Sequence, residues 1–161
     1  MTQTNVTPQT FRQTLGRFAS GVTVVTMVEN GETHGITVSA FLSGSLEPPL
    51  ILVSIDKKAH SHTRLMNVAH YGVSILSETQ QTLSNHFANR DPDVVPEFEK
   101  LQDFPVLKHA LAQLVCKTVQ HVDAGDHTLF IGQIEALAWQ EAGKPLVYFH
   151  GGYQKIEKLG L

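Results

Sequence analysis

The sequence predicts a mainly β protein of the α+β class, in which an antiparallel sheet closes on itself and three or four short helices cover its openings. Runs rich in β-branched residues alternate with turns, and the helical segments fall between them at irregular intervals. The regular strand–helix alternation that a parallel sheet requires is missing. The chain has 161 residues, enough for one core without disulfides or structural metal. We therefore expect residues 1–161 to form one domain.

The first expected element is a helix near the N-terminus. Thr7 is a typical N-cap and Pro8 a typical first helical residue. The helix is expected to end at Gly21 and to pack on the core through Phe11, Leu15 and Phe18.

A β-hairpin is expected next. Val22–Glu29 and Glu32–Ala40 read as strands, and Asn30-Gly31 between them accepts the positive φ angles of a tight turn. Phe41–Glu47 is expected to be a Ser/Gly-rich connection, and Leu50–Ile55 a mostly buried strand.

Two short helices are expected in the middle of the chain. Ser61 would cap the first, after a polar turn, and Ser77 or Thr79 would cap the second, which runs to about Ala88. Prolines among acidic residues predict a loop with at most one helical turn over Asn89–Pro105. The remaining strands are expected at Tyr71–Leu76, Leu111–Val122, His127–Trp139 and Leu146–His150.

Composition argues against several partners. The 12 Lys and Arg against 15 Asp and Glu give a net charge of −3 without a basic cluster, so nucleic acid and anionic membranes are not expected partners. No apolar run is long enough for a membrane span, and Met1–Pro8 has no signal-peptide pattern. Cys116 is the single cysteine, which fits a reducing compartment. We expect a soluble cytoplasmic protein.

Motifs common in other enzyme classes are absent. The sequence has no GxGxxG, GxxxxGK[ST], HExxH or GxSxG. Nicotinamide enzymes of the Rossmann type, P-loop NTPases and α/β-hydrolases are therefore disfavoured.

Ser54–Ser61 is the first segment with chemistry of its own. It runs from a strand end through Lys57 and Lys58 into an expected helix start, where backbone N–H groups, hydroxyls and ammonium groups can meet a phosphate. Taken alone, the segment also fits the commoner case of a solvated turn with an ordinary N-cap.

Two further segments could contact a ligand. Thr37–Ala40, followed by a Ser/Gly-rich stretch, offers hydroxyls and small side chains to a flat ligand, although such stretches are usually only loops. Gly125-Asp126-His127 places an imidazole beside a carboxylate at a strand start, and its ring could donate to a carboxamide; a plain turn with an exposed His is the alternative. A metal site at His60 and His62 is disfavoured, because side chains two apart at a helix start diverge.

Together these segments resemble the short-chain flavin reductase family, the small components of two-component flavin-dependent monooxygenases. The resemblance extends from Phe11 to Tyr153. Its most specific parts are Gly16–Thr26, Thr37–Ser45 with Pro49, Ser54–Ser61, Leu83–Ala88 and Gly125-Asp126-His127.

The resemblance implies a split β-barrel, usually homodimeric, in which NADH or NADPH reduces FAD or FMN without a catalytic side chain, because the hydride passes directly between the two cofactors. It implies that His127 and Tyr153 contact the nicotinamide. We also expect backbone N–H groups around Ser39 and Ser54 to stabilise the anionic reduced flavin, as oriented dipoles do at other reacting centres. The flavin would be bound by Thr37, Val38, Ser39, Ala40, Ser54, Ile55, Lys58, Ala59, Ser61, Asn85, His86 and Phe87.

The resemblance implies that reduced flavin passes to a separate, larger oxygenase. Three other interpretations remain open. A pyridoxamine phosphate oxidase-like FMN enzyme would need an arginine-rich phosphate site, and Arg12, Arg17, Arg64 and Arg90 are scattered. A non-catalytic flavin-binding protein would not need the Gly125-Asp126-His127 turn, and an interaction domain would not need the serines of Phe41–Glu47.

Overall fold

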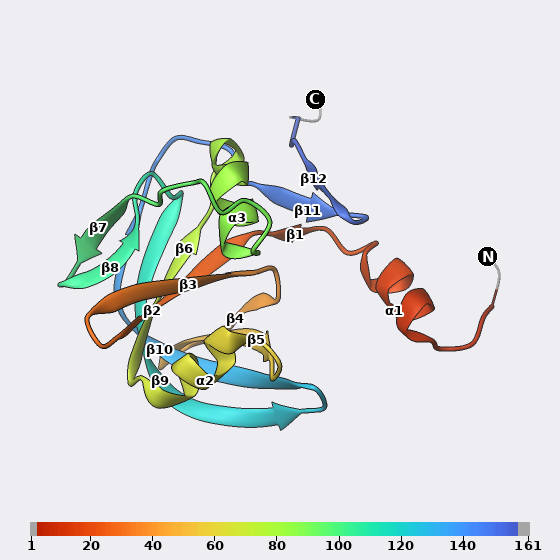
Figure 1. Ribbon diagram of the computed structural model, residues 1–161, viewed down its shortest axis with the longest axis horizontal. Coiled ribbons are helices and arrows are strands. Elements are labelled where there is room, and N and C mark those ends of the chain that lie inside the picture. Colours follow the sequence, from red (N-terminus) through yellow and green to blue (C-terminus); the bar gives the residue numbers. More distant parts are fainter. Residues whose placement is uncertain (1–2, 158–161) are drawn as a thin grey trace.

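The computed structural model describes residues 3–157 (Figure 1). Its helices are α1 (Pro8–Leu15), α2 (His60–Asn67) and α3 (Gln81–Phe87), the last preceded by the 3₁₀ turn η1 (Glu78–Gln80). Its strands are β1 (Ser20–Gly21), β2 (Thr23–Glu29), β3 (Glu32–Val38), β4 (Phe41–Leu46), β5 (Pro49–Asp56), β6 (His70–Ile75), β7 (Phe98–Leu101), β8 (Phe104–Leu107), β9 (Ala112–Ala124), β10 (His127–Trp139), β11 (Val147–Phe149) and β12 (Gly152–Gln154).

The main sheet has seven strands in the order β3-β2-β6-β9-β10-β5-β4, and every pairing in it is antiparallel. The mainly β, antiparallel prediction is therefore confirmed. The two end strands, β3 and β4, follow each other in the chain and are joined by only Ser39 and Ala40. A sheet whose two edges are joined by two residues has to curl until those edges approach each other at that link.

The predicted hairpin forms because its turn residues accept the backbone that it needs. Asn30 and Gly31 have φ angles of 53° and 82°, and β2 pairs with β3 from Thr23↔Val38 to Glu29↔Glu32. Such positive angles match the twist of the two strands.

The main core lies inside the curled sheet. Strand residues Val25, Val53, Tyr71 and Phe130 are fully buried in it, and α2 adds Leu65. A second cluster on the other side of β2 contains Val22, Val24, Leu76, Leu107 and Leu146, against which Phe87 and Tyr153 pack. Each large apolar side chain buried in this way contributes about 1.5–3 kcal/mol. Both faces of β2 are covered, so its adjacent Val24 and Val25 are equally buried.

Helix α1 corrects the prediction that its apolar stripe packs on the core. It begins with the predicted Thr7 cap but ends at Leu15, and none of its residues is buried. Figure 1 shows α1 projecting away from the sheet. Phe11, Leu15 and Phe18 remain 56%, 54% and 78% exposed, because the chain returns to the sheet at β1 and offers this stripe no partner.

Three segments expected to be irregular are strands. Phe41–Glu47, expected as a connection, contains β4, which pairs with β5 and bulges between Ser43 and Ser45. Asn89–Pro105, expected as a loop, contains β7 and the start of β8, joined through Gln102 and Asp103 at positive φ. The expected last strand is followed by β12, after a turn at His150 and Gly151. In each case cross-strand partners, rather than local propensity, determine the conformation.

No helix in residues 3–157 has the length and apolar character needed to cross a membrane.

Candidate functional site

The candidate site surrounds the link between β3 and β4. Three neighbouring hollows border it: a largely apolar one of about 450 Å³, a central one of about 230 Å³ and a third of about 220 Å³. Ser39 lines all three. Thr37 lines two of them, and Ser54, on β5 beside the edge strand β4, also lines two. The curling of the sheet thus brings together two predicted flavin-binding segments that lie far apart in the sequence.

The central hollow, of about 230 Å³, contains most of the predicted ring-binding residues. Both ends of the sheet contribute, since the edge strand β3 and its link supply Ile36–Ala40, while β5, next to the other edge strand, supplies Ser54–Asp56. His127, the first residue of β10, lines the same hollow because it pairs with Asp56 across the sheet. Strand pairing therefore places this imidazole beside Thr37–Ala40.

A larger hollow of about 910 Å³ adjoins the central one at Ile36. Of the predicted residues, it is lined by Lys58, Ala59, Ser61, His86 and Phe87. Its cationic groups and N–H donors suit the phosphate end of a ligand. Such volumes are typical of sites for small molecules and cofactors.

The start of α2 corrects the prediction that Ser61 is the N-cap. The cap is Ala59, and no side chain bonds to the helix end. Asp56 orders the turn instead, because its Oδ1 accepts from Lys58 N–H at 2.8 Å and its carbonyl accepts from Ala59 N–H at 3.0 Å. The Ser61 side chain is not used for capping, and Ser61 lines the larger hollow.

The Ser54 N–H group has a partner within the protein, which corrects part of the predicted role of this residue. It donates to the Ala40 carbonyl at 3.0 Å. This bond draws the β3–β4 link onto β5, so Ser54 shapes the hollow and its backbone donor is not free for a reduced flavin.

Two residues of helix α3, Ser84 and Asn85, form hydrogen bonds with residues that border the site. The Thr37 hydroxyl donates to the Ser84 carbonyl at 2.6 Å, and the Ser84 and Tyr153 hydroxyls lie 2.8 Å apart. Tyr153 also donates to Asn85 Oδ1 at 3.0 Å. Asn85 therefore contacts Tyr153 from β12, whereas the next two residues of α3 line the larger hollow.

His127 and Tyr153, the predicted nicotinamide pair, border different hollows. Tyr153 lines a third hollow, of about 220 Å³, together with Thr37 and Ser39, whereas His127 lines the central one. The structure brings each of them next to the β3–β4 link, but from different sides of it.

The turn before His127 carries an ordered carboxylate. Gly125 has a φ of 67°, and His127 Nδ1 lies 2.8 Å from Asp126 Oδ1. This contact with His127 lowers the pKa of Asp126 below its usual value. The carboxylate thus fixes the direction of the imidazole ring at the edge of the hollow.

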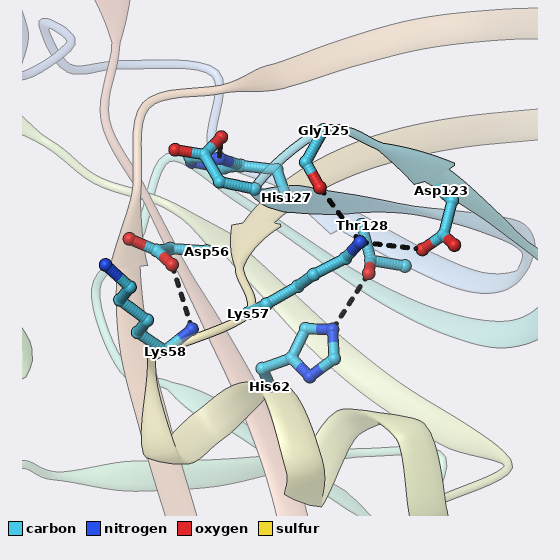
Figure 2. Close-up of polar contacts among 9 residues, drawn as sticks. Asp56, Lys57, Lys58, His62, Asp123, Gly125, His127 and Thr128 are labelled. Carbon is cyan, nitrogen blue, oxygen red and sulfur yellow. Dashed lines mark hydrogen bonds and ion pairs between the residues drawn. The ribbon is translucent and has the colours of Figure 1, made fainter. Parts of the chain in front are cut away.

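His60 and His62 diverge as predicted. His60 lines the larger hollow, whereas His62 Nε2 lies 2.9 Å from the hydroxyl of Thr128, below the site (Figure 2). The described residues include no group of three or more His, Cys, Asp or Glu side chains that could bind a metal.

Sequence reasoning missed two residues of the site and expected a different contact for a third. Asp56 organises the turn and lines the central hollow, and Arg64 lines the larger one while Glu29 accepts from its Nε at 3.1 Å. Arg64 lies three positions after Ser61 on one helix, a spacing that predicts a shared face. Lys57 was expected to meet a phosphate together with Lys58, but its Nζ contacts Asp123 and Gly125 at the turn before His127, and nothing in the sequence indicates this contact.

The donors present fit a flavin. A flat ring needs small side chains and backbone around it, which the residues of the β3–β4 link provide. A ribityl phosphate needs cations and hydroxyls, which Lys58 and Ser61 provide next to it. The two hollows meet at Ile36, so one ligand with a ring and a phosphate arm could occupy both.

Comparison with known proteins identifies the family. The model of the flavin reductase like domain matches residues 15–157. The chain belongs to this family. Its match includes every strand of the main sheet and all the predicted site residues.

Relatives of this family are similar over nearly the whole chain. An NADH-dependent flavin reductase from a Rhodococcus species is 45% identical over 96% of this chain and 90% of its own length. The reductase component of 4-hydroxyphenylacetate 3-monooxygenase from Thermus thermophilus is 38% identical over 92% of this chain and 96% of its own.

Solved structures of the family have the same fold. The flavin reductase PheA2 in its native state superposes with a TM-score of 0.92 at 44% identity, over 95% of this chain and all of that one. The NADH:FAD oxidoreductase SgcE6 of Streptomyces globisporus, in complex with NAD and FAD fragments, superposes with a TM-score of 0.88 at 30% identity, over 96% and 98% of the two chains.

Proposed function

We propose that this protein is an NADH-dependent flavin reductase that supplies reduced FAD or FMN to a separate flavin-dependent monooxygenase. The observation that carries the proposal is the central hollow, where the β3–β4 link, Ser54 and His127 border one space. Membership of the flavin reductase-like family and relatives named as reductase components of monooxygenases support it. NADH is favoured over NADPH by the name of the 45% identical relative.

When bound, flavin and nicotinamide supply the hydride chemistry themselves. The protein therefore needs only to bind the two groups and orient them relative to each other. Thr37–Ala40 and Ser54 would border the flavin ring, while Lys58 and Ser61 would hold its phosphate. His127, oriented by Asp126, would donate to the nicotinamide carboxamide from the start of β10.

The helix α3 closes the flavin site in this proposal. Phe87 and His86 line the larger hollow from α3, and the Thr37–Ser84 bond holds that helix against β3. Tyr153 would reach the nicotinamide side indirectly, as a positioning residue, because its hydroxyl is already bonded to Ser84 and Asn85.

The function is tested by following NADH oxidation in air by the purified protein, with and without FAD or FMN, and again with NADPH. We expect turnover that requires added flavin and is faster with NADH. Flavin binding without turnover would favour the non-catalytic flavin-binding protein, and the absence of both would refute the assignment.

A pyridoxamine phosphate oxidase-like activity is not supported by the arginines. Arg12 lies on the projecting helix α1, and Arg64 is paired with Glu29. Arg90 lines the third hollow without a second arginine.

Residues 1–161 are proposed to form one cytoplasmic domain whose sheet closes as a split barrel. The Ala40–Ser54 hydrogen bond supports closure, since it continues the β4–β5 pairing toward the end of β3. Trypsin digestion tests the single domain, which predicts no stable fragment smaller than the residues 15–157 that the family model matches.

A homodimer is proposed from the apolar surface around α1. Leu15, Phe18 and Leu42 are more than half exposed and line a largely apolar hollow of about 450 Å³. A second copy would cover this surface and the exposed strand edges symmetrically. Light scattering should give twice the chain mass of 17.7 kDa, and an active 17.7 kDa monomer would contradict the proposal.

A further inference from the structure

The turn between β9 and β10 extends past the end of its neighbouring strand. Pairing between β10 and β5 begins at His127↔Asp56, so Gly125 and Asp126 have no β5 residue opposite them. Gly125 has the positive φ of a tight turn, and nothing lies within 4 Å of a β-carbon built on it. Within the hairpin the turn is closed by the pairing of Ala124 with His127, and contacts from outside the hairpin add to this.

Lys57, the residue after β5, makes three contacts with this hairpin. Its Nζ lies 3.0 Å from Asp123 Oδ1 and donates to the Gly125 carbonyl at 2.9 Å. Its backbone N–H donates to the Asp126 carbonyl at 3.0 Å. Figure 2 shows this side chain extending across the gap to both Asp123 and Gly125.

The neighbouring Lys58 has a different environment. Its side chain extends away from the hairpin in Figure 2 and lines the larger hollow, where the phosphate is proposed to bind. The two adjacent lysines thus face different parts of the site.

The strand next to the turn is held independently. Thr128 is 4% exposed, and its hydroxyl lies 2.9 Å from His62 Nε2 on α2. Loss of the Lys57 side chain should therefore loosen the turn without displacing β10.

We propose that Lys57 is a positioning residue for nicotinamide binding: by holding the β9–β10 turn through Asp123 and Gly125, it keeps His127 at the edge of the central hollow. This inference rests on the proposed flavin reductase function. It assigns to Lys57 an effect on the nicotinamide half of the reaction and none on flavin binding.

The experiment compares Lys57→Met and Lys57→Arg with the wild type in steady-state kinetics and flavin titration. Lys57→Met should raise the KM for NADH roughly three- to tenfold, the size expected when an exposed ion pair and one carbonyl hydrogen bond are lost together. The flavin Kd should stay within about twofold, since Lys58 is intact. Lys57→Arg retains the charge and N–H donors and should restore most of the NADH affinity.

A matched control is Lys108→Met. Lys108 forms an ion pair with Glu97 at 3.2 Å, with a side chain 41% exposed against 38% for Lys57, and it lines none of the three hollows at the β3–β4 link. It should leave both constants unchanged. A second readout is the ¹⁵N relaxation order parameter of Gly125, which should fall in Lys57→Met alone.

An unchanged KM for NADH and an unchanged Gly125 order parameter in Lys57→Met would overturn the inference, as would an equal KM increase in Lys108→Met. A wild-type protein that binds flavin but does not oxidise NADH would instead refute the proposed function. The failure of the proposed function can be told apart from the failure of this inference, because it is observed in the wild-type protein without any substitution.

Discussion

The ring of Phe87 lies directly against the backbone of Gly35: a β-carbon at Gly35 would stand 2.6 Å from both Cδ1 and Cε1 of the ring. Gly35 lies in the middle of β3, and Phe87 is the last residue of α3. This contact sets how closely α3 approaches β3 and hence the width of the larger hollow, which both residues line.

Gly35→Ala should force α3 away from β3. We expect the free energy of unfolding to fall by about 1–3 kcal/mol, as in other overpacked cores, and flavin affinity to fall with it. Urea denaturation and flavin titration measure the two effects. Gly21→Ala is the control, because a β-carbon at Gly21 would have nothing within 4 Å of it; an equal loss in both variants would contradict the packing explanation.

Removal of the His127 side chain should impair the use of NADH. His127→Ala is expected to lower kcat/KM for NADH about tenfold, equivalent to about 1.4 kcal/mol, with flavin affinity unchanged. His70 is a suitable control, since it is also 39% exposed and lies 3.1 Å from a carboxylate, Glu135. Equal kinetics for wild type and His127→Ala would show that the imidazole has no role in nicotinamide binding.

Lys58 should discriminate flavins by their phosphate. Lys58→Met is expected to weaken FMN and FAD binding about fivefold while leaving riboflavin binding unchanged, because riboflavin has no phosphate for the ammonium group to contact. Fluorescence titration with the three flavins at two salt concentrations measures this. A uniform loss for all three would place Lys58 near the ring and not near the phosphate.

Cys116 should resist thiol reagents in the folded protein. Its side chain is fully buried in the main core, and burial raises its pKa to about 12. At pH 8 roughly one folded molecule in ten thousand then carries the reactive thiolate. Ellman's reagent should label it only after unfolding in urea, and rapid labelling of the native protein would show that the core opens.

The same burial predicts lower stability in alkali. The folded-state pKa of Cys116 exceeds the unfolded value, so the stability contributed by the buried neutral thiol is present below about pH 9 and is lost as the pH rises toward 12. Burial raises the pKa of Tyr71 as well, which adds to the loss. Cys116→Ala should reduce the slope of unfolding free energy against pH in this range.

Much of the fold was predictable because its signals are local. The positive φ angles of Asn30 and Gly31 are ones that asparagine and glycine accept more readily than other residues, and the Thr7-Pro8 start of α1 is where the sequence places it. Long runs of β-branched residues predicted β9 and β10 almost to their ends. Strands β4, β7 and β8 were not predicted, because serine, glycine, proline and charged residues form strands only where a partner strand is present.

The candidate site, like the fold, was predictable in part. The sequence alone indicated which segments carry suitable chemistry, since hydroxyls, lysines and a Gly-Asp-His turn are visible as residue types. The tertiary structure decided which of them meet: curling of the sheet joins Thr37–Ala40 to Ser54, and strand pairing brings His127 beside Asp56. It also decided which donors are already used, as with the Ser54 N–H and the Tyr153 hydroxyl. Residue type is a local property, whereas proximity and hydrogen-bond pairing depend on how distant parts of the chain pack, and so Lys57 and the exposed face of α1 could be recognised only in the folded protein.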